Sequence, residues 1–255
     1  MRSNRCLARL RAGGVTIGPM LVYDSTDLVE QVAHLGFDWI WLDWQHGQFA
    51  EHTLNGALAR FLHLDTAPIV RVKGNEPGTI NRVLDMGAMG VIVPMVQNVE
   101  QAAAAVRSTY YPPVGMRSAG GVRLDLIGGS FEQYIAEANA QIMLVVMVET
   151  EAAIANVREI MAVPGVDVVL IGPGDLMIDV RARGHDAAHH ERLALEVAAA
   201  AKESGIAAGY VCESAEIAER RLAQGYRFLN YGLDHFVLLG GFGAIRDQVR
   251  RWAPS

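Results

Sequence analysis

Charged side chains with catalytic potential stand at the ends of four apolar runs in this sequence. These runs cover residues 37–44, 68–70, 142–148 and 166–171, and the charged residues that follow or close them are His46, Arg71, Glu149 and Asp175. Buried parallel strands read as short apolar runs, and in barrel enzymes the residues at the carboxyl ends of such strands face the active site. Because a buried charge is costly unless it is paired or bound to metal, we expect these four residues to form one site.

Two of the four residues are carboxylates that end neighbouring predicted strands. Glu149 and Asp175 come without cysteine or histidine at ligand spacing, and such oxygen ligands suit a hard divalent cation such as Mg²⁺ or Mn²⁺. Spacing alone leaves a second interpretation open, in which Glu149 caps the next helix and Asp175 pairs with an arginine. Gly172 and Gly174 lie in the turn before Asp175, where backbone amides at a helix start favour an anionic group, although a turn can hold two glycines without any function.

The imidazole and the cations at the strand ends suggest two competing mechanisms. His46 is the candidate base, with Asp43 or Asp85 to hold its ring. Arg71 and Lys73 alternate with valines, so we expect both side chains to face the barrel interior. The chain has only two lysines, Lys73 and Lys202, and a Schiff-base mechanism would have to use Lys73. The remaining histidines are predicted to lie at the surface: His34, His52, His63, His185, His189, His190 and His235.

The apolar runs alternate with helical patterns along the whole chain. Eight strands are expected, beginning with residues 15–22 and ending with 228–231, and this alternation in about 250 residues predicts an α/β fold, a (β/α)8 TIM barrel, with residues 1–255 as a single domain. The Gly- and Pro-rich segment 110–130 is predicted to be an irregular functional loop. We predict helices over 151–162 and 191–204, and a polar insert from the turn at 172 through His190.

Composition argues against several classes of partner. The 255 residues carry 22 basic and 28 acidic side chains, a net charge of −6, without a basic run that would follow a phosphate backbone. Nucleic acid is therefore not an expected partner. No apolar run approaches the roughly 20 residues of a membrane helix. Cys6 and Cys212 lie far apart and form no disulfide framework, so we expect a cytoplasmic protein without a membrane partner.

A set of short motifs occurs in order over nearly the whole chain. The motifs are Gly36-Phe37-Asp38-Trp39, Asp43 with His46-Gly47, Arg71-Val72, Leu84-Asp85 with Gly87-Ala88 and Gly90 through Pro94, Tyr111-Pro112-Pro113 with Gly115 and Arg117, Val148-Glu149-Thr150, and Gly172-Pro173 with Asp175-Leu176. In this order they resemble the HpcH/HpaI family of class II, metal-dependent 2-keto acid (pyruvate) aldolases. Any one of these motifs is weak, whereas the ordered set is specific.

The resemblance implies a function and a role for each matching residue. It implies reversible cleavage of a 4-hydroxy-2-keto acid to pyruvate, or a close 2-oxo acid, and an aldehyde, with Mg²⁺, Mn²⁺ or Co²⁺ as cofactor. In this chain the implied metal ligands are Glu149 and Asp175, the base is His46, its supporting carboxylate is Asp85, and the cation for the developing enolate is Arg71. The implied substrate-binding positions are Arg71, Met147, Gly172, Gly174 and Asp175. A homo-oligomer, trimer or hexamer, is also implied, with the last helix packed on a neighbouring subunit.

Three positions depart from the family pattern. Gln45 stands where a glutamate often precedes the histidine, Met147 stands where a glutamine amide commonly reaches the substrate, and Gly174 replaces a more common serine or alanine. Loss of the amide at Met147 weakens the case for normal substrate orientation. Two rival functions therefore stay open: a lyase or oxaloacetate decarboxylase on the same barrel, and a non-catalytic protein that binds a 2-oxo acid. Whether Arg117 and Arg123 serve the same subunit or a neighbour is also open.

Overall fold

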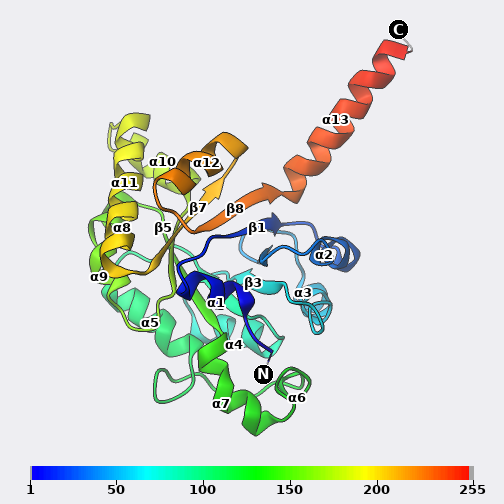
Figure 1. Ribbon diagram of the computed structural model, residues 1–255, viewed down its shortest axis with the longest axis vertical. Coiled ribbons are helices and arrows are strands. Elements are labelled where there is room, and N and C mark those ends of the chain that lie inside the picture. The colour runs from blue at the N-terminus through cyan, green and yellow to red at the C-terminus, as the bar shows by residue number, and fades with distance from the viewer. Residues whose placement is uncertain (1, 253–255) are drawn as a thin grey trace.

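Eight parallel strands close into a barrel in chain order, which confirms the predicted (β/α)8 architecture (Figure 1). The computed structural model describes residues 2–252. The strands are β1 (Thr16–Leu21), β2 (Trp39–Asp43), β3 (Ala67–Arg71), β4 (Gly90–Val93), β5 (Met143–Val148), β6 (Val168–Ile171), β7 (Ala207–Cys212) and β8 (Phe228–Leu233). Each predicted apolar run therefore forms a strand, and β8 pairs with β1 to close the barrel.

Helices cover the outside of the barrel and begin at recognisable signals. They are α1 (Arg5–Arg11), α2 (Thr26–Ala33), α3 (Glu51–Ala59), α4 (Pro77–Asp85), α5 (Val99–Thr109), α6 (Leu124–Gly128), α7 (Phe131–Gln141), α8 (Glu151–Ala155), α9 (Val157–Met161), α10 (Pro173–Ala182), α11 (Ala187–Ser204), α12 (Ala215–Ala223) and α13 (Asp234–Trp252). Side chains that accept a hydrogen bond from a first-turn amide cap six of them between α2 and α12: Ser25, Asn98, Ser130, Thr150, Asp186 and Ser214.

Three expectations about helices need correction. The segment 173–190 is not a polar insert, because Pro173 begins α10 and α11 begins already at Ala187. The expected helix over 151–162 is divided into α8 and α9. The segment 110–130 is also less irregular than expected, since α6 forms within it and the buried Arg117 anchors it.

Strict alternation of side chains decides which residues reach the interior of the barrel. In β2, Trp39 and Trp41 pack inside, whereas Ile40 and Leu42 belong to the layer between strands and helices. The ring of Trp39 stacks on Phe228 of β8 with 3.9 Å between centroids. Asp43 follows on the same inward face, at the carboxyl end of the strand, and parallel register places it opposite Arg71 of β3.

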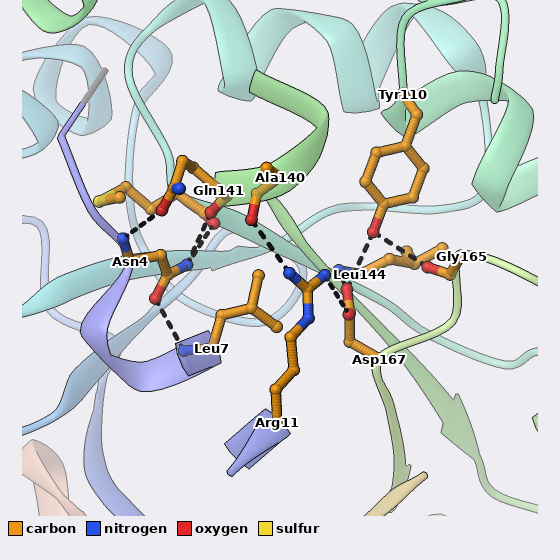
Figure 2. Close-up of polar contacts among 10 residues, drawn as sticks. Asn4, Leu7, Arg11, Tyr110, Ala140, Gln141, Leu144, Gly165 and Asp167 are labelled. Carbon is orange, nitrogen blue, oxygen red and sulfur yellow. Dashed lines mark hydrogen bonds and ion pairs between the residues drawn. The ribbon is translucent and has the colours of Figure 1, made fainter. Parts of the chain in front are cut away.

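The amino end of the barrel is closed by α1, which polar contacts hold in place (Figure 2). Asn4 donates its backbone N–H to Gln141 Oε1 at 2.7 Å and its side-chain amide to the Gln141 carbonyl at 3.0 Å. Arg11 pairs with Asp167 at 3.1 Å, and the Tyr110 hydroxyl lies 2.9 Å from the same carboxylate. The apolar residues that α1 inserts below the barrel interior are Cys6, Leu7 and Leu10.

The last helix, α13, projects away from the barrel (Figure 1). Its first residue, Asp234, accepts hydrogen bonds from the backbone amides of Val22 and Tyr23 through Oδ2 and so ties the helix to the end of β1. Beyond this anchor the helix exposes large apolar side chains: Phe236, Val237, Leu238, Leu239, Phe242, Ile245, Val249 and Trp252. Within residues 2–252, no helix combines the length and apolar character needed to cross a membrane.

Candidate active site

A buried ion pair joins the carboxyl ends of β2 and β3. Arg71 Nε donates to Asp43 Oδ1 at 2.8 Å, and Nη2 donates to Oδ2 at 2.7 Å. Asp43 is only 1% exposed, and the Arg71 guanidinium lies 4.9 Å from the centre of the Trp41 ring. Among the described residues, Arg71 Nη1 has no hydrogen-bond partner, so its two N–H groups stay available for a ligand in the mouth. Asp43 therefore fixes Arg71 instead of holding the ring of His46.

The turn after β2 presents His46 at the mouth of the barrel. Asp43 Oδ1 also accepts the backbone N–H groups of Gln45, at 3.2 Å, and His46, at 3.4 Å. A Cβ atom on Gly47 would overlap the carbonyl oxygen of Asp43, so the turn requires glycine there. The His46 ring is exposed and makes no hydrogen bond within residues 2–252. Both ring nitrogens are therefore accessible for proton transfer.

Glu149 and Asp175 converge beside the Arg71 cation. Glu149 is 2% exposed and accepts the Met95 N–H at 2.8 Å. The pKa of Glu149 is raised to about 7, mainly by burial and also by the adjacent Asp175 carboxyl, while the Met95 amide and Arg71 oppose the shift. Met95 has φ of +56°, a left-handed conformation uncommon for a residue with a side chain, and this backbone supplies the amide that Glu149 accepts.

This carboxylate pair fits the divalent cation that the family resemblance implies. Glu149 is buried whereas Asp175 is exposed, and the two adjacent acids repel each other, so that a proton or a cation at the pair compensates their charge. Gly172 lies directly against the pair, and a Cβ atom there would overlap Glu149 Oε1. Glu149 and Asp175 would hold the cation, with the remaining positions open to water or substrate oxygens.

The first turn of α10 supplies amides next to the carboxylate pair. Pro173 is the first helical residue, and the N–H groups of Gly174 and Asp175 follow it at the helix amino terminus, where an anion is favoured. Gly174 is exposed, and a Cβ atom there would meet open space, so the glycine makes backbone contacts available without a steric requirement.

Two further predicted positions have clear environments. Met147 packs inside the barrel one layer below Glu149, and its 1% exposure makes it part of an apolar floor under the site. Lys73 does not enter the interior: its side chain is exposed, and Nζ lies 4.4 Å from the centre of the Trp44 ring. The structure therefore separates Lys73 from the cluster formed by Arg71, Glu149 and Asp175.

Asp85 lies at the opposite end of the barrel from His46. It is the last residue of α4, which runs from the carboxyl end of β3 back to the amino end of β4. There it accepts a hydrogen bond from Arg117 at 2.8 Å. Burial raises the pKa of Asp85, and Arg117 counteracts this shift. Within one chain the structure does not bring Asp85 to His46.

Arg117 and Arg123 stabilise the segment around Asp85. The Arg117 side chain is fully buried and stacks 4.6 Å from the centre of the Tyr111 ring. Arg123 donates to the backbone carbonyls of Asn55 and Met86. Both arginines are therefore remote from the mouth of their own barrel.

One histidine differs from the surface prediction. His190 is buried, because α11 begins one turn earlier than expected and directs this residue toward the body of the protein. The other six histidines predicted at the surface are exposed or partly exposed.

Comparison with known proteins identifies the family. The HpcH/HpaI aldolase/citrate lyase model matches residues 20–240. The 4-hydroxy-2-oxovalerate aldolase of Novosphingobium aromaticivorans is 37% identical, covering 98% of this chain and 94% of the relative. The 4-hydroxy-2-oxo-heptane-1,7-dioate aldolase of Escherichia coli is 35% identical over 92% of this chain and 90% of its own.

A solved structure agrees with these sequence matches. The crystal structure of a HpcH/HpaI aldolase/citrate lyase family protein from Burkholderia cenocepacia superposes with a TM-score of 0.90 at 31% identity, covering 97% of this chain and 100% of that one. From the sequence matches and this structural agreement together, we conclude that the chain belongs to the HpcH/HpaI aldolase/citrate lyase family.

Proposed function

We propose that this protein cleaves a 4-hydroxy-2-oxo acid reversibly into pyruvate, or a close 2-oxo acid, and an aldehyde, with a divalent cation bound by Glu149 and Asp175. Its family and its aldolase relatives at 35% and 37% identity make it an enzyme, a carbon–carbon lyase. A metal requirement is part of this proposal, and the two adjacent carboxylates, which are suitable ligands for a hard divalent cation, support it. The observation that carries the proposal is the convergence of the two carboxylates beside Arg71, whose Nη1 has no hydrogen-bond partner among the described residues.

The cluster divides the work of the reaction among its residues. A divalent cation, when bound, supplies Lewis acidity toward the keto oxygen of the 2-oxo acid. Arg71, held rigid by Asp43, directs Nη1 toward the oxygen that gains negative charge as the carbon–carbon bond breaks. The N–H groups of Gly174 and Asp175 receive the substrate carboxylate. In cleavage His46 takes the proton from the aldol hydroxyl and returns it to the enolate carbon; in synthesis it takes the proton from the methyl group and returns it to the new alkoxide oxygen.

The apolar floor shapes the substrate preference of this site. Met147 offers no amide to the 2-oxo acid, so orientation depends on Arg71, the α10 amides and the cation. We therefore expect the enzyme to accept 2-oxo acids somewhat larger than pyruvate, because one hydrogen-bond constraint is missing.

Removal of the metal, comparison of substrates and trapping with borohydride test the proposed reaction. A chelator should abolish pyruvate release from hydroxylated 2-keto acids, and Mg²⁺, Mn²⁺ or Co²⁺ should restore it, with oxaloacetate decarboxylation measured in parallel. Lys73→Met should retain activity, and borohydride with pyruvate should trap no adduct. Three outcomes would each reject the proposed function. They are turnover without metal, covalent trapping at Lys73, and release of pyruvate from oxaloacetate but not from hydroxylated 2-keto acids.

We also infer that Asp85 supports His46 of a second copy of this chain. Asp85 lies at the amino end of its own barrel, whereas His46 lies at the mouth. The exposed apolar face of α13 gives the chain a surface that a second copy would cover in a trimer or hexamer.

The buried free thiols of Cys6 and Cys212 suit a cytoplasmic location.

Co-expression of two inactive variants tests this arrangement. His46→Ala removes the base, and Asp85→Asn removes the charge but keeps an acceptor for Arg117. If Asp85 serves a neighbour, random assembly at equal amounts should restore about one quarter of the sites, because one variant supplies His46 and the other Asp85. If both residues serve the same chain, the mixture should be as inactive as either variant alone.

A further inference from the structure

Two histidines and a glutamate meet at the surface of the protein, and none of the three belongs to the carboxylate pair in the mouth. Glu151 is the first residue of α8, His185 lies between α10 and α11, and His189 lies in the first turn of α11. His185 Nδ1 is 2.8 Å from Glu151 Oε1, and His189 Nε2 is 3.3 Å from the same oxygen. One ligand atom of each residue lies within 4.8 Å of the other two.

Hydrogen bonds to Asp179 and Asp186 hold the elements that carry Glu151 and His189 in this arrangement. Asp179 Oδ2 accepts the Glu151 N–H at 2.8 Å and Arg183 Nε at 3.0 Å. Asp186 caps α11 by accepting the His189 N–H at 2.9 Å. The elements that carry Glu151 and His189 are thus fixed before any ion arrives, and such preorganisation favours metal binding.

The chemistry of these ligands differs from that of the site in the mouth. Two imidazoles and one carboxylate, with a fourth position left for water, are a ligand set for Zn²⁺ and related transition-metal ions. In a tetrahedral site with bonds near 2.1 Å the ligand atoms lie about 3.4 Å apart, so the observed oxygen–nitrogen distances need only small adjustments.

Two details of His189 bear on ion binding. Nε2 is buried and lacks a well-formed hydrogen bond, which marks it as an unsatisfied ligand atom. Nδ1 accepts from Arg192 Nη2 at 3.1 Å. Coordination through Nε2 would place the proton on Nδ1 and displace Arg192, an exposed side chain that is free to turn into solvent.

We propose that Glu151, His185 and His189 form a second metal site, selective for Zn²⁺-like ions, that braces α8 against the start of α11. The ion replaces the hydrogen bond between Glu151 and His185 and the 3.3 Å contact between Glu151 and His189. His185 lies in the short connection between α10 and α11, so the site also links α8, which follows β5, to the end of α10, which follows β6. These two strands lead to Glu149 and Asp175. This inference does not depend on the proposed reaction.

Zinc titration of the full chain tests the site once the mouth can no longer bind a cation. In a Glu149→Gln/Asp175→Asn background, calorimetry should show one Zn²⁺ per chain, and Co²⁺ should give the visible absorption of a tetrahedral ion. Adding His185→Ala and His189→Ala should weaken Zn²⁺ binding by more than about 10-fold and remove the Co²⁺ bands. A matched control, His34→Ala with His63→Ala, removes two exposed histidines elsewhere and should change neither.

Thermal unfolding and hydrogen exchange test the brace itself. Zn²⁺ should raise the Tm of the background protein and slow amide exchange at the beginnings of α8 and α11, and it should do neither in the His185/His189 variant. The proposal is overturned if the background protein binds no Zn²⁺, if binding survives loss of both histidines, or if exchange in α8 and α11 is unchanged at saturation. In each of these cases the three residues form only a hydrogen-bonded surface cluster.

Discussion

Replacement of Arg71 by methionine should destabilise the protein far more than the loss of an ordinary arginine. The substitution removes both hydrogen bonds of the Asp43–Arg71 pair, at 2.8 and 2.7 Å, and leaves Asp43 charged at 1% exposure. Among residues 2–252, only the amides of Gln45 and His46, at 3.2 and 3.4 Å, would then donate hydrogen bonds to it. Breaking a buried ion pair in this way costs about 3–5 kcal/mol, and we expect Arg71→Met to lower the free energy of unfolding by this amount.

A surface pair in the same protein provides the control. Arg82 Nε lies 2.8 Å from Glu51 Oε1, but the two side chains are 54% and 50% exposed. Both variants are measured by urea titration, and Arg82→Met should lower the free energy of unfolding by less than about 1 kcal/mol. If Arg71→Met costs no more than Arg82→Met, the buried pair does not orient the mouth and our account of Arg71 is refuted.

A double variant separates the two roles of Arg71. Asp43→Asn with Arg71→Met leaves no unpaired charge, so the double variant should be more stable than Arg71→Met alone by about 2 kcal/mol or more. Its turnover should stay at least about 10²-fold below that of the unmodified enzyme, because Nη1 is still missing. Recovery of activity together with stability would contradict the role assigned to Arg71 in the reaction.

Two further predictions concern the carboxylate pair. Because burial and Asp175 raise the pKa of Glu149 to about 7, the folded metal-free protein holds a proton that the unfolded chain releases near its ordinary pKa. Its free energy of unfolding should fall by about 3 kcal/mol between pH 4.5 and 7 relative to Glu149→Gln, as measured by urea titration at several pH values, and an equal pH slope in both proteins would disprove the shift. Gly172→Ala should displace Glu149 Oε1 and weaken Mg²⁺ or Mn²⁺ binding at least about 10-fold in calorimetry, whereas Gly174→Ala, which meets open space, should have little effect; equal affinities in the two variants would contradict the geometry.

The strands were predictable because apolar runs and their charged ends carry a clear pattern. Alternation from Trp39 through Trp41 to Asp43 predicts which side chains face inward, and it leads directly to the site. The same reasoning would have paired Asp43 with Arg71, since both end neighbouring parallel strands on one face. The proximity of Asp43 to His46 in the sequence instead suggested an interaction between these two side chains, whereas the structure pairs Asp43 with Arg71.

Other features depend on tertiary geometry that residue order does not display. Asp85 matches its motif, yet it stands at the end of a helix that returns to the amino end of the barrel, and its contact with Arg117 spans 32 residues. Two signals mark the start of α10, Pro173 at the first position and Asp175 in the first turn. Its apolar and polar residues are not clearly separated onto two faces, however, and the segment therefore resembles a polar insert. The burial of His190 follows from the length of α11, which the pattern underestimated.

The seal that α1 forms beneath the barrel has a kinetic consequence. With Leu7 and Leu10 filling the amino end and Asn4 and Arg11 fastening the helix, whatever reacts at Glu149 must arrive and depart on one side. Both products must leave through the carboxyl-terminal end of the barrel, one after the other. If the 2-oxo acid is held as proposed, by a cation and the α10 amides, it should exit last, so that pyruvate competes with the incoming substrate while the aldehyde does not.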